Sequence, residues 1–159
     1  MADVEFNFED NRVEIKRAIS DAIGAVLLEI SSEIVSKAAR NTPVDSGQLK
    51  GSWKANVDEY KGEAVIGSPL ENALWNEFGT GNYALEGKGR LTPWYVPVDG
   101  YTGTKKPTYN GQVIIVYGKD GKAFYKTNGK KPQRSLQKAF DSTKKKAQKA
   151  LENKLKGLK

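Results

Sequence analysis

The chain has 159 residues, a length that suits one domain with a sizeable core. It contains neither cysteine nor histidine, which excludes disulfides, thiolate or imidazole metal sites, and serine–histidine or cysteine–histidine nucleophiles. The formal net charge of +7 is concentrated at the carboxyl end, because residues 130–159 hold eleven lysines and arginines against Asp141 and Glu152.

The first residues, MADVEFNFEDNR, are acidic and lack the basic and then apolar pattern of a secretion signal. No apolar run approaches the ~20 residues that a membrane-spanning helix needs. We therefore expect a soluble protein that remains in the compartment where it is made.

Apolar residues between positions 15 and 38 recur at spacings of three and four, which predicts one long amphipathic helix over about 11–40. Asn11 and Glu14 have the spacing of a capping box at its start. The helix is expected to end within residues 41–47 (NTPVDSG), because proline disfavours helix in the residue that precedes it.

The middle of the chain changes its hydrophobic period. A short helical turn is predicted over 48–51, capped by Asp45-Ser46. Alternating apolar and polar residues then predict two strands joined by a turn, at about 53–58 and 63–67. A short helix over about 70–78 leads into a glycine-rich stretch.

Residues 79–111 hold no persistent period, so we expect a mobile surface loop with a small element near 94–98. Residues 113–125 predict a hairpin with a four-residue loop, and its first strand is apolar on both faces. Such a strand must be covered by the domain or by a partner. A final helix is predicted over about 133–156. Because no internal repeat or linker is evident, residues 1–159 are expected to form one domain.

The groups that could suggest catalysis have simpler structural explanations. Gly79-Thr80-Gly81 lacks the third glycine of a dinucleotide-binding motif, and Gly87-Lys88-Gly89 lacks the other residues of a Walker loop. Helix capping accounts for Asp45-Ser46. Glu71 and Glu77 are interpreted as two solvated charges rather than as an acid–base pair. We expect no catalytic, cofactor-binding or metal-binding residues.

The lysine-rich carboxyl-terminal helix is a candidate for DNA contact. Clustered lysines release counterions from DNA and bind it without reading its sequence. These lysines surround the helix instead of forming one stripe, so a merely solvated helix face is the alternative. The DNA-channel candidates are Lys144, Lys145, Lys146 and Lys149.

Three segments in this order carry a resemblance to a known family: residues 42–52 (TPVDSGQLKGS), 72–81 (NALWNEFGTG) and 129–140 (GKKPQRSLQKAF). They resemble the neck, or tail-completion, proteins of long-tailed double-stranded DNA phages. Ser135 stands where phenylalanine is usual in that family. The segment over about 81–127 is longer than expected for the family and is treated as an insertion.

The resemblance implies an α+β fold, in which a long amino-terminal helix and a carboxyl-terminal helix pack on a small antiparallel sheet, with an extended loop or hairpin insertion. It further implies a structural subunit without catalysis or cofactor, arranged as a ring of six copies at the head–tail junction of the virion. The expected partners are the protein itself, adjacent neck and tail-tube proteins and, transiently and without sequence preference, genomic DNA. Assembly would take place in the host cytoplasm.

Glycines that permit a sharp exit from the core, followed by rigid aromatic anchors, are typical of a contact segment. The interface candidates are Phe78, Gly79, Thr80, Gly81, Trp94 and Tyr95. A small basic protein that binds nucleic acid without sequence specificity is the alternative function. Self-association that is independent of DNA would distinguish the neck subunit from it.

Overall fold

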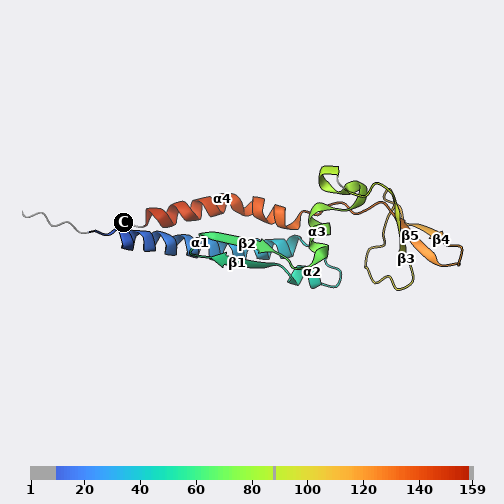
Figure 1. Cartoon of the computed structure of the whole chain (residues 1–159), viewed down its shortest axis with the longest axis horizontal. Coiled ribbons are helices and arrows are strands. Elements are labelled where there is room, and N and C mark those ends of the chain that lie inside the picture. Colours follow the sequence, from blue (N-terminus) through green and yellow to red (C-terminus); the bar gives the residue numbers. More distant parts are fainter. Residues whose placement is uncertain (1–9, 88, 158–159) are drawn as a thin grey trace, which may run out of the picture.

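The computed structural model describes residues 10–87 and 89–157, so the acidic segment 1–9 lies outside the described residues. Figure 1 shows an elongated molecule, with a pair of long helices at one end and a small sheet at the other. Helix α1 (Arg12–Asn41) and helix α4 (Ser135–Lys156) run antiparallel and side by side. Both predicted helices are thereby confirmed.

Helix α1 buries one stripe of side chains. Its buried apolar members recur every four residues and are Ala22, Val26, Ile30, Ile34 and Ala38. The core is completed by Trp53, Ala73 and Ala139 from three other parts of the chain. The predicted capping box is wrong, because Asn11 makes no side-chain cap hydrogen bond and its backbone is not in the extended region that a capping residue needs.

A hairpin covers one side of α1. The short helix α2 (Gln48–Gly51) leads into strands β1 (Lys54–Asp58) and β2 (Glu63–Gly67), which pair antiparallel with Asn56 opposite Val65. The predicted turn and both predicted strands are confirmed to within a residue or two. The hairpin lies along α1 in Figure 1.

The segment 42–53 is anchored to the core through hydrogen bonds. The indole nitrogen of Trp53 donates to the Thr42 hydroxyl over 2.8 Å, and that hydroxyl donates to the Ala38 carbonyl over 2.7 Å. Since Trp53 and Thr42 are both buried, the chain that leaves α1 is fixed to its last turns and the hairpin starts from a defined place.

Helix α3 (Glu71–Phe78) is followed by 3₁₀ turns at Gly81–Tyr83 and Leu85–Gly87 and then by a second sheet. This sheet has the antiparallel order β3-β5-β4, built from β3 (Trp94–Pro97), β4 (Ile114–Tyr117) and β5 (Ala123–Thr127). The small element predicted near 94–98 and the hairpin predicted at 113–125 are both confirmed. With two long helices and small antiparallel sheets, the fold is α+β.

Candidate assembly surfaces and the joint that positions them

The start and the end of the insertion cross at one hydrogen-bonded joint. The Thr80 amide donates to the Lys130 carbonyl over 2.9 Å, and the Lys130 amide donates to the Thr80 hydroxyl over 3.0 Å. The Asn82 amide donates to the Asn128 carbonyl over 2.9 Å. Two segments about fifty residues apart in sequence therefore lie edge to edge.

The two glycines of this joint are buried, so the expectation of a mobile surface loop is wrong at its start. Gly79 has a φ of +74°, and a Cβ atom there would lie 2.7 Å from the Tyr83 carbonyl oxygen and 2.9 Å from that of Lys130. Gly81 has a φ of +60°, and a Cβ atom there would overlap the Asn128 carbonyl. Both the backbone angle and the close approach of the chains therefore require glycine at these positions.

Glu77 caps helix α4, although it stands 58 residues before the first residue of that helix. Its carboxylate accepts the Leu136 amide over 2.9 Å and the Gln137 amide over 2.8 Å. The first amides of a helix have no partner within the helix and favour negative charge. The interpretation of Glu77 as a solvated charge is therefore wrong, because this half-buried side chain ties α3 to α4.

A buried polar cluster lies beside this cap. The Asn76 side-chain amide donates to the Ser135 hydroxyl over 2.9 Å, and that hydroxyl donates to the Asn41 carbonyl over 3.1 Å. Ser135 is 0% exposed. A serine here joins the ends of α1, α3 and α4 by hydrogen bonds, where phenylalanine would find no free space.

Next to the joint, an apolar groove of about 340 Å³ opens between β2 and α4. Ile34 of α1 forms its floor, and Phe78 and Phe140 line it while remaining 52% and 49% exposed. Its other lining residues are Ala64, Ile66, Glu77, Leu85, Arg134, Leu136 and Gln137. Of the interface candidates, Phe78 thus lines a surface groove, whereas Gly79, Thr80 and Gly81 form the joint behind it.

Residues 7–79 match the model of the HK97-gp10-like family, described as "Bacteriophage HK97-gp10, putative tail-component". Over this segment, which is a little less than half of the chain, the protein is similar to a phage tail-component family. No curated protein and no solved structure matches the chain. The family match confirms the resemblance seen in the sequence motifs, and it ends at Gly79, where the joint begins.

Asp45 does not cap the turn that follows it; of the two expected capping residues only Ser46 contributes, since its hydroxyl accepts the Gln48 amide over 3.4 Å. The Asp45 carboxylate accepts hydrogen bonds from the amide of Thr104, over 3.0 Å, and from the hydroxyl of the same residue. These bonds lower the pKa of Asp45. The loop that follows β3 is thereby attached to residues 7–79, the segment that matches the family, at a second place besides the joint of Thr80 and Lys130.

The remaining interface candidates, Trp94 and Tyr95, and the four lysine candidates lie in different surroundings. Trp94 is half-buried, and the Arg90 guanidinium lies 5.7 Å from the centre of its ring. Tyr95, the next residue, is on the opposite face of β3 and is 55% exposed. Lys144, Lys145 and Lys149 are exposed and take part in no ion pair within the described part of the chain.

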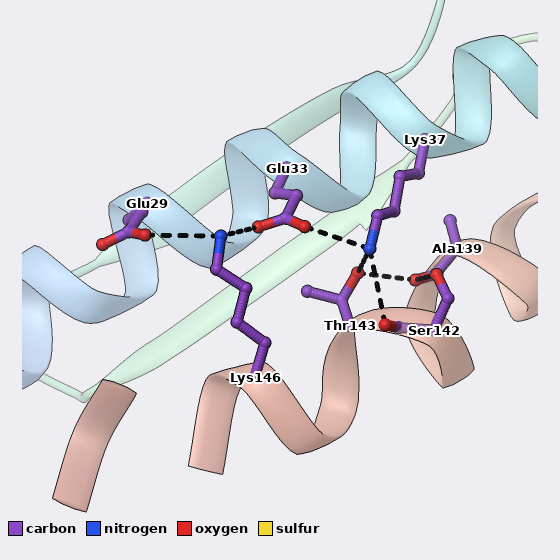
Figure 2. A network of polar contacts seen from close by, with 7 residues as sticks. All are labelled: Glu29, Glu33, Lys37, Ala139, Ser142, Thr143 and Lys146. Atoms are coloured by element: carbon purple, nitrogen blue, oxygen red, sulfur yellow. Dashed lines mark hydrogen bonds and ion pairs between the residues drawn. The ribbon is translucent and has the colours of Figure 1, made fainter. Parts of the chain in front are cut away.

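Lys146 differs from the other three lysines because it has acidic partners, which Figure 2 shows. Its ammonium lies 2.5 Å from a Glu33 carboxylate oxygen and 3.7 Å from one of Glu29. Glu33 also pairs with Lys37 at 3.0 Å, and Lys37 donates to the Thr143 hydroxyl over 3.0 Å. Lys146 therefore joins α4 to α1 instead of projecting freely for DNA.

This network predicts an acid-sensitive contribution to stability. Hydrogen bonds from Lys146 and Lys37 lower the pKa of Glu33. A carboxylate with a lowered pKa stabilises the fold above its unfolded-state pKa, and the contribution is lost as pH falls through the folded-state value. We expect Lys146→Met to melt a few degrees below wild type near neutral pH, and the difference to shrink in acid below the ordinary pKa of glutamate.

Thermal melts of both proteins between about pH 7 and about pH 3 check this. Lys145→Met is the matched control, because Lys145 is exposed on the same helix and has no ion pair among the described residues. A constant difference between Lys146→Met and wild type at every pH would show that the Glu33 carboxylate is not the responsible group.

No set of three or more acidic side chains in residues 10–87 and 89–157 is placed to hold a metal ion. Lys88, the central residue of the second glycine pair, lies outside these ranges. None of the helices that the structure describes is long and apolar enough to cross a membrane.

Proposed function

We propose that the protein is a structural ring subunit of the phage neck, which joins the DNA-filled head to the tail tube. The observation that carries this proposal is the family match over residues 7–79, since that segment comprises α1, the hairpin and α3 with the Glu77 cap. The segment also contributes β2 and Phe78 to an open apolar groove. Apolar surface of this kind on a tail component supports a role in contacts between subunits.

The subunit acts without catalysis and without a cofactor. In a ring of six copies, one surface of each copy binds a different surface of the next copy. Such head-to-tail contacts close into a ring when the rotation between neighbours is suitable. The faces of the ring bind adjacent neck and tail-tube proteins, with Tyr95 and Trp94 on the insertion sheet as candidate contacts. Rings would form in the host cytoplasm and then reside at the head–tail junction.

Ring formation can be tested directly. Purified protein should sediment as a discrete oligomer in nuclease-treated samples, and particles viewed along their axis should show a closed ring. In tails or virions, labelled protein should lie at the junction of head and tail. A protein that stays monomeric at high concentration and locates elsewhere on the virion would contradict the proposal.

Weak attraction for DNA would suit a ring through which the genome passes, because tight binding would obstruct passage and strong negative charge would repel the DNA. Lys144, Lys145 and Lys149 are free to supply this attraction. We expect duplex DNA to bind with a Kd of ~10⁻⁴ to 10⁻⁶ M, without sequence preference and with steep loss in salt.

The triple variant Lys144→Gln, Lys145→Gln, Lys149→Gln should weaken this binding and flatten its salt dependence. Titration of two unrelated labelled duplexes at low and near-physiological salt measures both effects. The control carries Gln at Lys16, Lys50 and Lys54, which removes the same charge from exposed positions elsewhere. Tight, salt-resistant binding to one duplex would favour the alternative, a small nucleic-acid-binding protein.

A further inference from the structure

The groove borders an unpaired strand edge. Among the described residues β2 pairs only with β1. Residues of β2 and α4 line the groove, while no residue of β1 does. The edge of β2 that is not bonded to β1 therefore lies on the groove side of the hairpin, and within the described residues the β2 backbone makes no hydrogen bond other than those to β1. An apolar groove beside an unpaired strand edge accepts an extended segment that adds as a third strand.

A segment with the required pattern exists in this chain. Residues 3–9 read DVEFNFE, in which Val4, Phe6 and Phe8 alternate with polar residues. An extended chain with this alternation presents all three apolar side chains on one face. That face could fill the groove while the backbone pairs with β2.

The charges of the two surfaces are complementary. Residues 1–10 contain four acidic side chains and no lysine or arginine. The groove lining contains one cation, Arg134, and one carboxylate, Glu77, whose oxygens already accept the first amides of α4. Lys144 lies outside the lining and follows Phe140 by one helical turn. Opposite charge favours this pairing and disfavours the approach of another basic segment.

Phe6 and Phe8 cannot reach the groove floor of their own subunit. They precede Arg12 by six and four residues, which span at most about 22 Å and about 14 Å. Ile34 on the groove floor lies 22 residues beyond Arg12 in α1, or about 33 Å along the helix axis. The occupant must therefore come from another copy.

We propose that residues 3–9 of one subunit add to β2 in the groove of a neighbouring subunit, with Phe6 and Phe8 beside Phe140. The inference rests on the proposed ring and names the contact that links its subunits. Donor segment and acceptor groove are unlike surfaces on one chain, so each copy can give one strand and receive one. This is the heterologous arrangement that a closed ring requires.

The first test uses the full chain and a variant lacking residues 2–9. A labelled peptide of residues 2–10 should bind the shortened variant, and a peptide with Phe6→Ser and Phe8→Ser should bind at least about tenfold more weakly, because it loses two buried aromatic side chains. The shortened variant should also lose the self-association of the full chain. Failure of the unmodified peptide to bind overturns the strand addition.

A mixing experiment identifies the two surfaces. Phe6→Ser/Phe8→Ser retains the groove but lacks the donor, whereas Phe140→Asp retains the donor and carries a charge in the groove. Each should be monomeric alone, and the two should form a heterodimer when mixed, with one intact contact. Tyr60→Ser, at a fully exposed position outside the groove lining, is the control that should assemble like wild type.

The outcomes separate this inference from the proposed function. Rings that persist without residues 2–9 overturn the donor strand while leaving the neck subunit intact. Full-length protein that forms no ring although the peptide binds the groove contradicts the ring and supports the strand addition. Circular dichroism of Phe140→Asp should show that the helices are retained, since Phe140 is a half-exposed residue.

Discussion

Gly79→Ala should lower the free energy of unfolding by about 3 kcal/mol or more, the largest effect expected of any single substitution considered for this chain. The new methyl group would lie within 3 Å of two carbonyl oxygens and of the Pro132 ring. These atoms belong to a backbone that is fixed by the crossing of Thr80 and Lys130. Urea unfolding followed by circular dichroism measures the change.

Gly47→Ala is the comparison for a positive φ without overlap. Gly47 has a φ of +82° and a ψ of −13°, in the left-handed helical region, and nothing lies within 4 Å of the added Cβ atom. Gly79→Ala carries two further costs, because its ψ of 179° places it in a region that essentially only glycine enters and because the new methyl group meets the crossing backbone. Equal destabilisation of the two variants would show that the crossing is looser than described.

Glu77→Ala should cost about 2 kcal/mol, because the Leu136 and Gln137 amides at the start of α4 would lose their acceptor. For a chain of this size that corresponds to a fall in melting temperature of roughly 4–8 °C. Glu77→Gln should fall between Ala and wild type, since one amide oxygen can replace only one of the two carboxylate acceptors. Differential scanning calorimetry would rank the three proteins.

Glu71→Ala provides the comparison within the same helix. Glu71 is exposed at the start of α3, and no hydrogen bond or ion pair connects it to α4 among the described residues. Its removal should change stability by less than about 0.5 kcal/mol. If both glutamates prove equally dispensable, the cap on α4 does not contribute to stability.

The helices and strands could be predicted from sequence because their signals are local. The four-residue recurrence of apolar side chains defines α1, and the alternation around Trp53 and Val65 defines the first hairpin. Turn residues and β-branched runs likewise locate β4 and β5. Each of these patterns is complete within about thirty residues of chain.

The joint and the functional surfaces could not be predicted in this way, because they depend on contacts between distant residues. Glu77 has the local pattern of a solvated charge, and only the position of α4 turns it into a cap. Asp45 has the pattern of a turn residue but meets Thr104 in the insertion. Lys146 is indistinguishable in sequence from Lys145, yet only Lys146 reaches Glu33.

The crossing at Thr80 and Lys130 bears on how this chain could have acquired its second sheet. Since the segment enters and leaves the body at adjacent hydrogen-bonded residues, the length of chain between them can change without displacing α3 or α4. Insertions or deletions here would change one appendage and its bonds from Thr104 to Asp45, while the contacts between α1 and α4 stay as they are. The second sheet is therefore the part of the chain in which we expect changes of length to be tolerated.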